Sequence, residues 1–421
     1  MKDNIIAGLD IGSTAIRLVV GQKKFDDRGA SSLQIIGAVE VPTTGISKGV
    51  VTSIEDATSS ISACLEKAER LIGVPIESVW VGINFPNVKC ERSRGVVAVG
   101  KSDGEITEED MERAIEAARA LSVPPNYEIL HVIPVKFTVD NQEDIKDPIG
   151  MTGIRLEVET LIIQGLSSQI KNLTKAIYRT GLEIEDLVLS PLASAEAVIN
   201  PKQKELGALL VNIGAVTTSI AVFEEGELLH TAILPIGSEH ITADVAIGLR
   251  CPITLAEKIK VEYGSAKSDN FEKDDEVNIK NIMDSDEMDE DNSVLSRKYI
   301  AEIIEARIEE IFEKVDNELK RIERSGMLPA GAFLIGGGSK ISNLVDVAKA
   351  KLRLPATLGS NKAAAVVIDK VEDLSYLTAL GLALWGNQAS IRDKKGGSWL
   401  NKANVSGSVD KLKKWFSSLM P

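Results

Sequence analysis

The chain is poor in cysteine, histidine and aromatic residues. Its 421 residues include three cysteines, three histidines and 4% aromatic residues. The cysteines (Cys64, Cys90 and Cys251) lie far apart and form no Cys-x-x-Cys pair, which argues against a structural zinc site and indicates a reducing compartment. Because aromatic side chains are scarce, the core has to be built mainly from isoleucine, leucine, valine and alanine.

Long apolar runs and an excess of positive charge are also missing. No run is long enough to cross a bilayer, and no signal peptide is visible before the first expected strand. We therefore expect a cytoplasmic protein unless a further element tethers it. The formal net charge of −14 argues against a general nucleic-acid binder. The length allows two or more domains.

One pattern is present twice. Residues 5–20 and 208–223 each read as an apolar strand, a turn and a second apolar strand. Each turn begins with Asx-Ile-Gly, at Asp10 in the first copy and Asn212 in the second, and continues with small or hydroxyl residues. Successive backbone N–H groups in such a turn can form a concave nest for phosphate oxygens. One such turn also fits an ordinary hairpin, but two facing turns would hold a polyphosphate from both sides.

A third motif follows late in the chain. Residues 332–335 read as a short strand, a glycine run follows at 336–338, and apolar residues then recur at helical spacing from 341 to 348. Bare glycine backbone lets a flat base or ribose lie close to it. Two phosphate turns followed by a glycine-rich adenosine turn resemble the actin, Hsp70 and sugar-kinase superfamily.

Other segments narrow the resemblance. Between residues 84 and 164, short strands surround one helix that Thr107 caps, which predicts a small inserted α/β domain. With the segments 256–264, 295–310 and 380–385, this insertion resembles the FtsA family of bacterial cell-division proteins. The resemblance implies an actin-like α/β fold of two related lobes. The implied parts are a first lobe (1–83, 165–196 and 363–386), the small inserted domain (84–164), a second lobe core (197–240 and 328–362), its subdomain (241–327), a flexible linker (387–407) and an amphipathic helix (408–421).

The resemblance also implies a ligand, ATP with magnesium, between the lobes. Asp10 would hold magnesium through water. The cofactor-binding residues that it implies are Gly12, Ser13, Thr14, Arg17, Gly214, Ala215, Val216, Thr217, Glu257, Lys260, Gly336, Gly337, Gly338 and Ser339.

Two departures from the superfamily pattern concern catalysis. The second turn has Asn212 where an aspartate is usual, and the position that orients attacking water has Ser190. An asparagine can neither accept a proton nor supply a charge to a metal ion. We therefore expect nucleotide binding with slow or absent hydrolysis. Asp10, Asn212 and Ser190 occupy the positions that are catalytic in the superfamily.

The C-terminal segment differs in charge from the rest of the chain. From residue 387 onward it has seven basic and two acidic residues, a net charge of +5 within a total of −14. In residues 408–421 the apolar side chains fall on one stripe of a helix with lysines beside it, which is typical of an in-plane membrane anchor. A helix docked on its own domain or in a protein groove is the alternative. The membrane-facing residues are Val409, Leu412, Lys413, Lys414, Trp415, Phe416 and Leu419.

The implied partners follow from the family. They are the C-terminal tail of the tubulin-like ring protein FtsZ, further copies of the chain in a head-to-tail filament, an anionic membrane surface at the division site, and other division proteins at residues 84–164. Arg297 and Arg307 are the candidate contacts for the acidic FtsZ tail. A small-molecule kinase and an actin-like adaptor of pilus assembly remain alternatives. The acidic stretch 269–291 has no assigned role.

Overall fold

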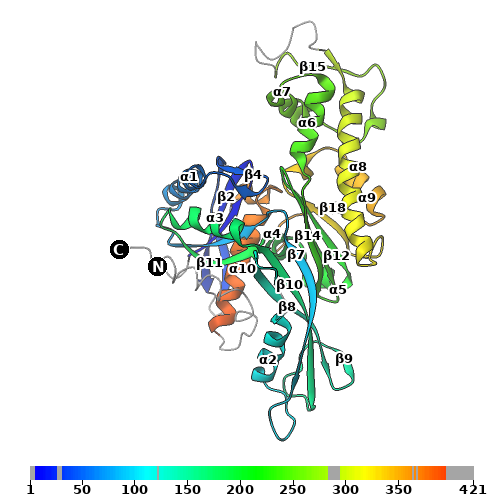
Figure 1. Cartoon of the computed structure of the whole chain (residues 1–421). Coiled ribbons are helices and arrows are strands. Elements are labelled where there is room, and N and C mark those ends of the chain that lie inside the picture. Colours follow the sequence, from blue (N-terminus) through cyan, green and yellow to red (C-terminus); the bar gives the residue numbers. More distant parts are fainter. Residues whose placement is uncertain are drawn as a thin grey trace.

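The computed structural model describes residues 5–25, 31–120, 123–282, 294–362, 365–366 and 368–394. Figure 1 shows an elongated molecule with one helical end, labelled α6 to α8, and a β-rich end that contains α2 and β9. The predicted membrane helix and most of the predicted linker lie outside the described residues, as do residues 283–291 of the acidic stretch.

The first lobe is built on a six-stranded sheet in the order β11-β6-β1-β2-β3-β19. Strands β1 to β3 form an antiparallel meander, while β6 pairs with β1 and β11 with β6 in parallel. The strands are β1 (Ile5–Ile11), β2 (Ala15–Phe25), β3 (Ser31–Pro42), β6 (Ser78–Ile83), β11 (Glu183–Leu189) and β19 (Ala365–Val366). Helices α1 (Ile54–Ile72), α3 (Ser167–Tyr178), α4 (Ser190–Val198) and α10 (Leu377–Lys394) and the small hairpin β4 (Ile46–Ser47) and β5 (Val50–Val51) complete it.

The second lobe repeats this topology with five strands in the order β14-β13-β12-β17-β18. Again a meander of three strands carries two further strands in parallel. The strands are β12 (Ala208–Ile213), β13 (Thr218–Glu224), β14 (Glu227–Leu234), β17 (Gly331–Ile335) and β18 (Ala356–Leu358). Alternate residues of β12 belong to two apolar cores, Leu210 to the first lobe's core and Leu209 and Val211 to the second's. Burial on both faces explains why β12 is almost continuously apolar.

Helices dominate the outer part of the second lobe. They are α6 (Ser238–Leu249), α7 (Ile253–Tyr263) and the long α8 (Arg297–Arg321), with the short strands β15 (Glu276–Asn278) and β16 (Val294–Ser296). Helix α9 (Leu344–Leu352) packs on α8, and α5 (Pro201–Leu206) precedes β12. One face of α8 is apolar and packs inward, with Ile300, Ile304, Ile308 and Ile311 all fully buried.

The inserted domain has its own antiparallel sheet in the order β7-β10-β8-β9. Its strands are β7 (Lys89–Ala98), β8 (Tyr127–Val139), β9 (Gln142–Ile145) and β10 (Arg155–Leu166), and α2 (Glu108–Arg119) packs on them. Thr107 caps α2 as predicted, within a capping box shared with Asp110. A Cβ atom on Gly95 would lie 1.9 Å from the carbonyl oxygen of Ala114, so this glycine allows α2 to approach β7.

The last described helix corrects one expectation. A linker was expected from residue 387, but α10 continues to Lys394. Asn387 and Ala389 are buried, and Gln388 donates a 3.0 Å hydrogen bond to Glu196 of α4. The polar and small residues that suggested a linker instead pack the helix against its neighbour.

Candidate functional site

The first turn, Gly12–Thr14, joins β1 to β2. The N–H of Gly12 donates to the carbonyl oxygen of Ala15 at 3.1 Å, and a Cβ atom on Gly12 would lie 2.7 Å from that oxygen. The hydroxyl of Ser13 accepts a 2.9 Å hydrogen bond from the N–H of Gly49. Within the described part of the chain, the N–H groups of Ser13 and Thr14 have no acceptor. Two adjacent free donors are what a phosphate-binding nest requires.

The second turn, Gly214–Thr217, has the same backbone pattern. The N–H of Gly214 donates to the carbonyl oxygen of Thr217 at 2.9 Å, and among the described residues the N–H groups of Ala215 and Val216 have no acceptor. The side chain of Asn84, at the end of β6, donates a 3.1 Å hydrogen bond to the hydroxyl of Thr217. The two lobes are therefore in direct contact beside this turn.

The residues that precede the two turns differ in their surroundings. Asp10 lies at the end of β1, where burial raises its pKa to about 6 although the charge of Arg17 opposes this. Asn212 occupies the matching place on β12, and its amide donates a 3.1 Å hydrogen bond to the hydroxyl of Thr378 on α10. One strand end therefore presents a carboxylate that resists ionisation, and the other a neutral amide already held in place.

The glycine run follows β17 as predicted, but a 3-10 turn (Gly337–Lys340) comes before α9. Gly336 has φ +89°, and a Cβ atom there would lie 2.3 Å from Oδ1 of Asn212. A Cβ atom on Gly338 would lie 2.5 Å from the side chain of Ile213. A Cβ atom on Gly337 would have no atom of the described residues within 4 Å. Two of the glycines are thus required by packing against β12, and the third faces open space.

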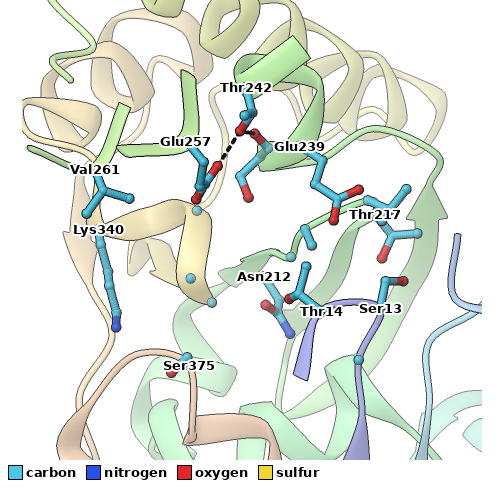
Figure 2. A pocket seen from close by; sticks show the side chains of 18 of the residues that line it. Ser13, Thr14, Asn212, Thr217, Glu239, Thr242, Glu257, Val261, Lys340 and Ser375 are labelled. Carbon is cyan, nitrogen blue, oxygen red and sulfur yellow. Dashed lines mark hydrogen bonds between the residues drawn. The ribbon is translucent and has the colours of Figure 1, made fainter. Parts of the chain in front are cut away.

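Two residues of α7 form a polar cluster with α6. The ammonium of Lys260 donates to the carboxylate of Glu257 at 2.5 Å and to the hydroxyl of Thr242 at 2.8 Å, and Thr242 donates to Glu257 at 2.5 Å. Lys260 is buried, whereas Glu257 is half exposed. Figure 2 shows Glu257 beside Thr242 on the wall of a cavity. The cluster places Glu257 and Lys260, two of the residues that the resemblance implied, on the wall of this cavity.

All these elements line one cleft of about 1250 Å³ between the lobes. Of the predicted cofactor-binding and catalytic residues, the cleft brings together Asp10, Gly12, Ser13, Thr14, Arg17, Asn212, Gly214, Ala215, Val216, Thr217, Glu257, Lys260, Gly336, Gly337 and Gly338. Ser339 does not line it, since its hydroxyl bonds the carbonyl oxygen of Ile335. Ser190 does not line it either; it is buried next to Gly82, with its hydroxyl unpaired among the described residues.

Several lining residues were not predicted. They include Glu40, Asn84, Glu239, Lys340, Asp373 and Tyr376. Some of them hold predicted residues in place: Glu40 accepts a 2.7 Å hydrogen bond from Arg17, whose guanidinium lies 5.7 Å from the ring centre of Tyr376. The only signal in the sequence was proximity for two of them, because Glu239 lies shortly after β14 and Lys340 shortly after the glycine run.

The remaining predicted residues lie elsewhere. Arg307 is held by Asp244 through two hydrogen bonds of 2.6 and 2.9 Å and also pairs with Glu310. Arg297 is exposed and lies 4.6 Å from the ring centre of Phe271. The membrane-facing residues from Val409 to Leu419 lie outside the described residues. In the described ranges, no helix combines the length and hydropathy that crossing a bilayer requires.

The chain was then compared with known proteins. Residues 86–164 match the model of the SHS2 domain inserted in FtsA, and residues 209–381 match the model of cell division protein FtsA. The cell division protein FtsA of Pseudomonas aeruginosa is 34% identical over 415 residues, covering 98% of this chain and 97% of that protein. The chain belongs to the FtsA family of cell division proteins. FtsA membership confirms the predicted family and favours a division protein over a kinase or a pilus adaptor.

Solved structures place the FtsA chain in the actin-like fold. A PilM-PilN type IV pilus biogenesis complex shares 17% identity with a TM-score of 0.63, over 90% of this chain and 98% of that one. MreB 5 of Spiroplasma citri bound to AMPPNP shares 12% identity with a TM-score of 0.55, over 94% and 100% of the two chains. At these identities the likeness concerns the fold alone, and it confirms the predicted two-lobed actin-like architecture.

The cleft residues fit a polyphosphate better than a free metal ion. Each turn offers two free N–H donors, and Gly337 leaves room beside bare backbone. Among the described residues, no group of three or more histidine, cysteine, aspartate or glutamate side chains could hold a metal ion. Magnesium usually binds through one or two carboxylates together with substrate phosphates and water. Asp10 fits such a shared site, in which the nucleotide supplies most of the ligands.

Proposed function

We propose that the protein binds ATP with magnesium in the cleft, assembles head to tail into filaments, and tethers the FtsZ ring to the cytoplasmic face of the membrane through residues 408–421. The observation that carries the proposal is the pair of matching turns. Both turns present two free N–H groups to the same cleft. One elongated anion with several phosphates fits this arrangement better than two separate ligands would.

Hydrolysis should be slow. Asn212 cannot take up a proton and already donates to Thr378, and Ser190 does not line the cleft. Of the three positions assigned to catalysis, this leaves Asp10, whose pKa is raised to about 6. A carboxylate can act as a general base near its pKa, but it needs a positioned water. Turnover of ATP at rates typical of a kinase would contradict this part of the proposal.

The FtsZ tail is proposed to dock near Arg297 rather than Arg307. Arg307 is engaged by Asp244 and Glu310, so an acidic peptide would have to displace two carboxylates. Arg297 is exposed and has the neighbouring apolar side chains Val294 and Tyr299, which are 49% and 46% exposed. Arg297→Ala should therefore weaken binding of a labelled FtsZ tail peptide more than Arg307→Ala does.

The membrane part of the proposal rests on the sequence of residues 408–421. A single short amphipathic helix binds membrane only modestly, but a filament presents many copies at once and multiplies the affinity. Attachment should therefore depend on assembly, and assembly on nucleotide. This coupling distinguishes a division filament from a protein with a permanently inserted anchor.

Co-sedimentation with anionic liposomes tests membrane attachment and its dependence on nucleotide. Full-length protein and a chain stopped after Asn401 are compared, each with and without ATP and magnesium. We expect pelleting that requires both the C-terminal residues and ATP. Equal pelleting of the two chains would show that residues 402–421 are not the anchor. Pelleting of the full chain that ignores ATP would separate membrane binding from assembly and contradict the proposed coupling.

A further inference from the structure

Most acidic side chains on the wall of the cleft have a cationic partner there. The ion pairs are Arg17–Glu40 at 2.7 Å, Lys260–Glu257 at 2.5 Å and Lys340–Asp373 at 2.6 Å. Glu239 also lines the cleft and is exposed, but its carboxylate has no ion-pair or hydrogen-bond partner among the described residues. An ionised group that faces a binding cleft without a partner is available to a ligand.

The backbone fixes where this carboxylate lies. Glu239 belongs to the first turn of α6, and its N–H donates a 2.7 Å hydrogen bond to the carbonyl oxygen of Ala215 in the second phosphate turn. The N–H of Ser238 donates to Gly214 at 2.9 Å. A Cβ atom on Gly237 would lie 2.6 Å from the Ala215 oxygen, so this glycine allows the close approach. Helix α6 therefore begins directly on the second turn.

The side chain points toward the phosphate side of the cleft. In Figure 2 the carboxylate of Glu239 points toward Thr217 of the second turn and Ser13 of the first. These residues all line the same cleft. A polyphosphate held by the two turns would therefore place its outer phosphate groups near a free negative charge. Like charges repel strongly inside a cleft with low-dielectric walls, unless a cation lies between them.

We propose that Glu239 makes triphosphate binding depend on a divalent cation, by facing the cation that the outer phosphates hold. This inference rests on the proposed binding of ATP in the cleft. Asn212, on the second lobe, supplies no charge to a cation, and Asp10 lies on the first lobe at the end of β1. A hard cation such as Mg²⁺ needs oxygen ligands and commonly takes one or two carboxylates beside the phosphates. The exposed carboxylate of Glu239 meets that need from the opposite lobe.

The experiment measures affinity for ATP and ADP by isothermal titration calorimetry, in excess MgCl₂ and in EDTA. It compares the full-length parent, Glu239→Gln and the control Glu262→Gln. Glu262 is exposed on the same lobe and does not line the cleft, so the control makes the same change in net charge. Thermal unfolding of each protein verifies that it is folded.

Removing the repulsion should raise the affinity for ATP in EDTA by about 3- to 10-fold in Glu239→Gln, and removing a metal-facing charge should lower it in MgCl₂. In Glu239→Gln, the ATP affinity in MgCl₂ divided by that in EDTA should therefore fall by about tenfold or more relative to the parent. Glu262→Gln should keep the parent ratio. The effect should be smaller for ADP, which lacks the outermost phosphate.

An unchanged ratio in Glu239→Gln, with ATP still bound, would overturn the role of Glu239 and leave ATP binding intact. An equal change in both variants would assign the effect to net charge and overturn it as well. If the parent binds ATP in neither buffer, the proposed nucleotide binding fails first and the role of Glu239 fails with it.

Discussion

The hairpins β1–β2 and β12–β13 have the same turn geometry but different neighbours. Each turn closes with an N–H to carbonyl hydrogen bond across three residues, of 3.1 Å in the first and 2.9 Å in the second. Asp10 precedes the first turn and Asn212 the second, at matching positions of two related meanders. A duplicated backbone can therefore support two chemically different strand ends, one titratable and one neutral.

The strands before the turns also differ. Gly8 of β1 corresponds to Leu210 of β12, two residues before Asp10 and Asn212 respectively. A Cβ atom on Gly8 would lie 2.3 Å from the carbonyl oxygen of Ala379 and 2.6 Å from the nitrogen of Ala383, both on α10. Leu210 is instead fully buried in an apolar core. The first hairpin is thus packed against helix backbone, and the second against side chains.

The largest expected effect comes from breaking this packing. Gly8→Ala should lower the free energy of unfolding by about 3 kcal/mol, because the added methyl group would overlap rigid backbone of α10. Gly337→Ala is the matched control, since no atom of the described part of the chain lies within 4 Å of a Cβ atom there. Chemical denaturation of both variants checks this. Equal stability of the two would mean that β1 and α10 are not in close backbone contact.

The second prediction exchanges the two strand ends. Burial raises the pKa of Asp10 to about 6 from its ordinary value of 3.8, so the folded state holds this proton more tightly than the unfolded state. The stability that this proton contributes is complete below pH 4 and is lost as the pH rises through 6. Asp10→Asn should therefore stabilise the protein by about 2 kcal/mol at pH 7.5 and hardly at all at pH 4.

Asn212→Asp should do the reverse. It places a carboxylate at a buried position, so it should cost about 2 kcal/mol at pH 7.5 and less at lower pH. Urea denaturation at several pH values, read as the difference between each variant and the parent, isolates the two groups from the other titrating residues. Parallel pH curves for Asp10→Asn and the parent would show that the Asp10 carboxyl is not desolvated in the folded protein.

Much of this site could be predicted because its chemistry is local. Asx-Ile-Gly at Asp10 and Asn212 and the glycine run at 336–338 each specify a turn within a few residues, and turn residues depend on backbone geometry more than on distant contacts. The cap of α2 by Thr107 followed from capping rules in the same way. The order of the motifs then indicated how the turns meet in space.

The rest depended on long-range packing. Nothing local to Glu239 shows that α6 begins on the second turn, because that contact joins two separate segments through Gly237. A linker was expected from residue 387 because 387–407 is rich in lysine, glycine, serine and asparagine without periodicity. Gln388, however, donates a hydrogen bond to Glu196 on α4, almost two hundred residues away in the sequence. Ser190 was placed by analogy with the superfamily, but it is buried beside Gly82 and does not line the cleft.

A smaller effect is expected from the hydrogen bonds that hold Asn212. Thr378 accepts from Asn212 at 3.1 Å and from Ser194 at 3.0 Å, all three side chains being buried. Thr378→Val keeps the shape but removes the acceptor, so it should cost about 1 to 2 kcal/mol. Thr378→Ser, which keeps the hydroxyl, should cost less. If both variants lose the same stability, packing of the methyl group and not the hydrogen bond holds Asn212.

The smallest effect distinguishes the two turns themselves. A Cβ atom would lie 2.7 Å from the Ala15 oxygen at Gly12, but 3.0 Å from the Thr217 oxygen at Gly214. Gly12→Ala should therefore strain its turn more. It should lower the free energy of unfolding by about 1 kcal/mol, against a few tenths of a kcal/mol for Gly214→Ala. The same order should hold for ATP affinity, because each turn presents its N–H groups only while it stays closed. Titration of both variants with ATP decides this: a greater loss in Gly214→Ala would mean that the second turn, with α6 behind it, carries more of the phosphate contact.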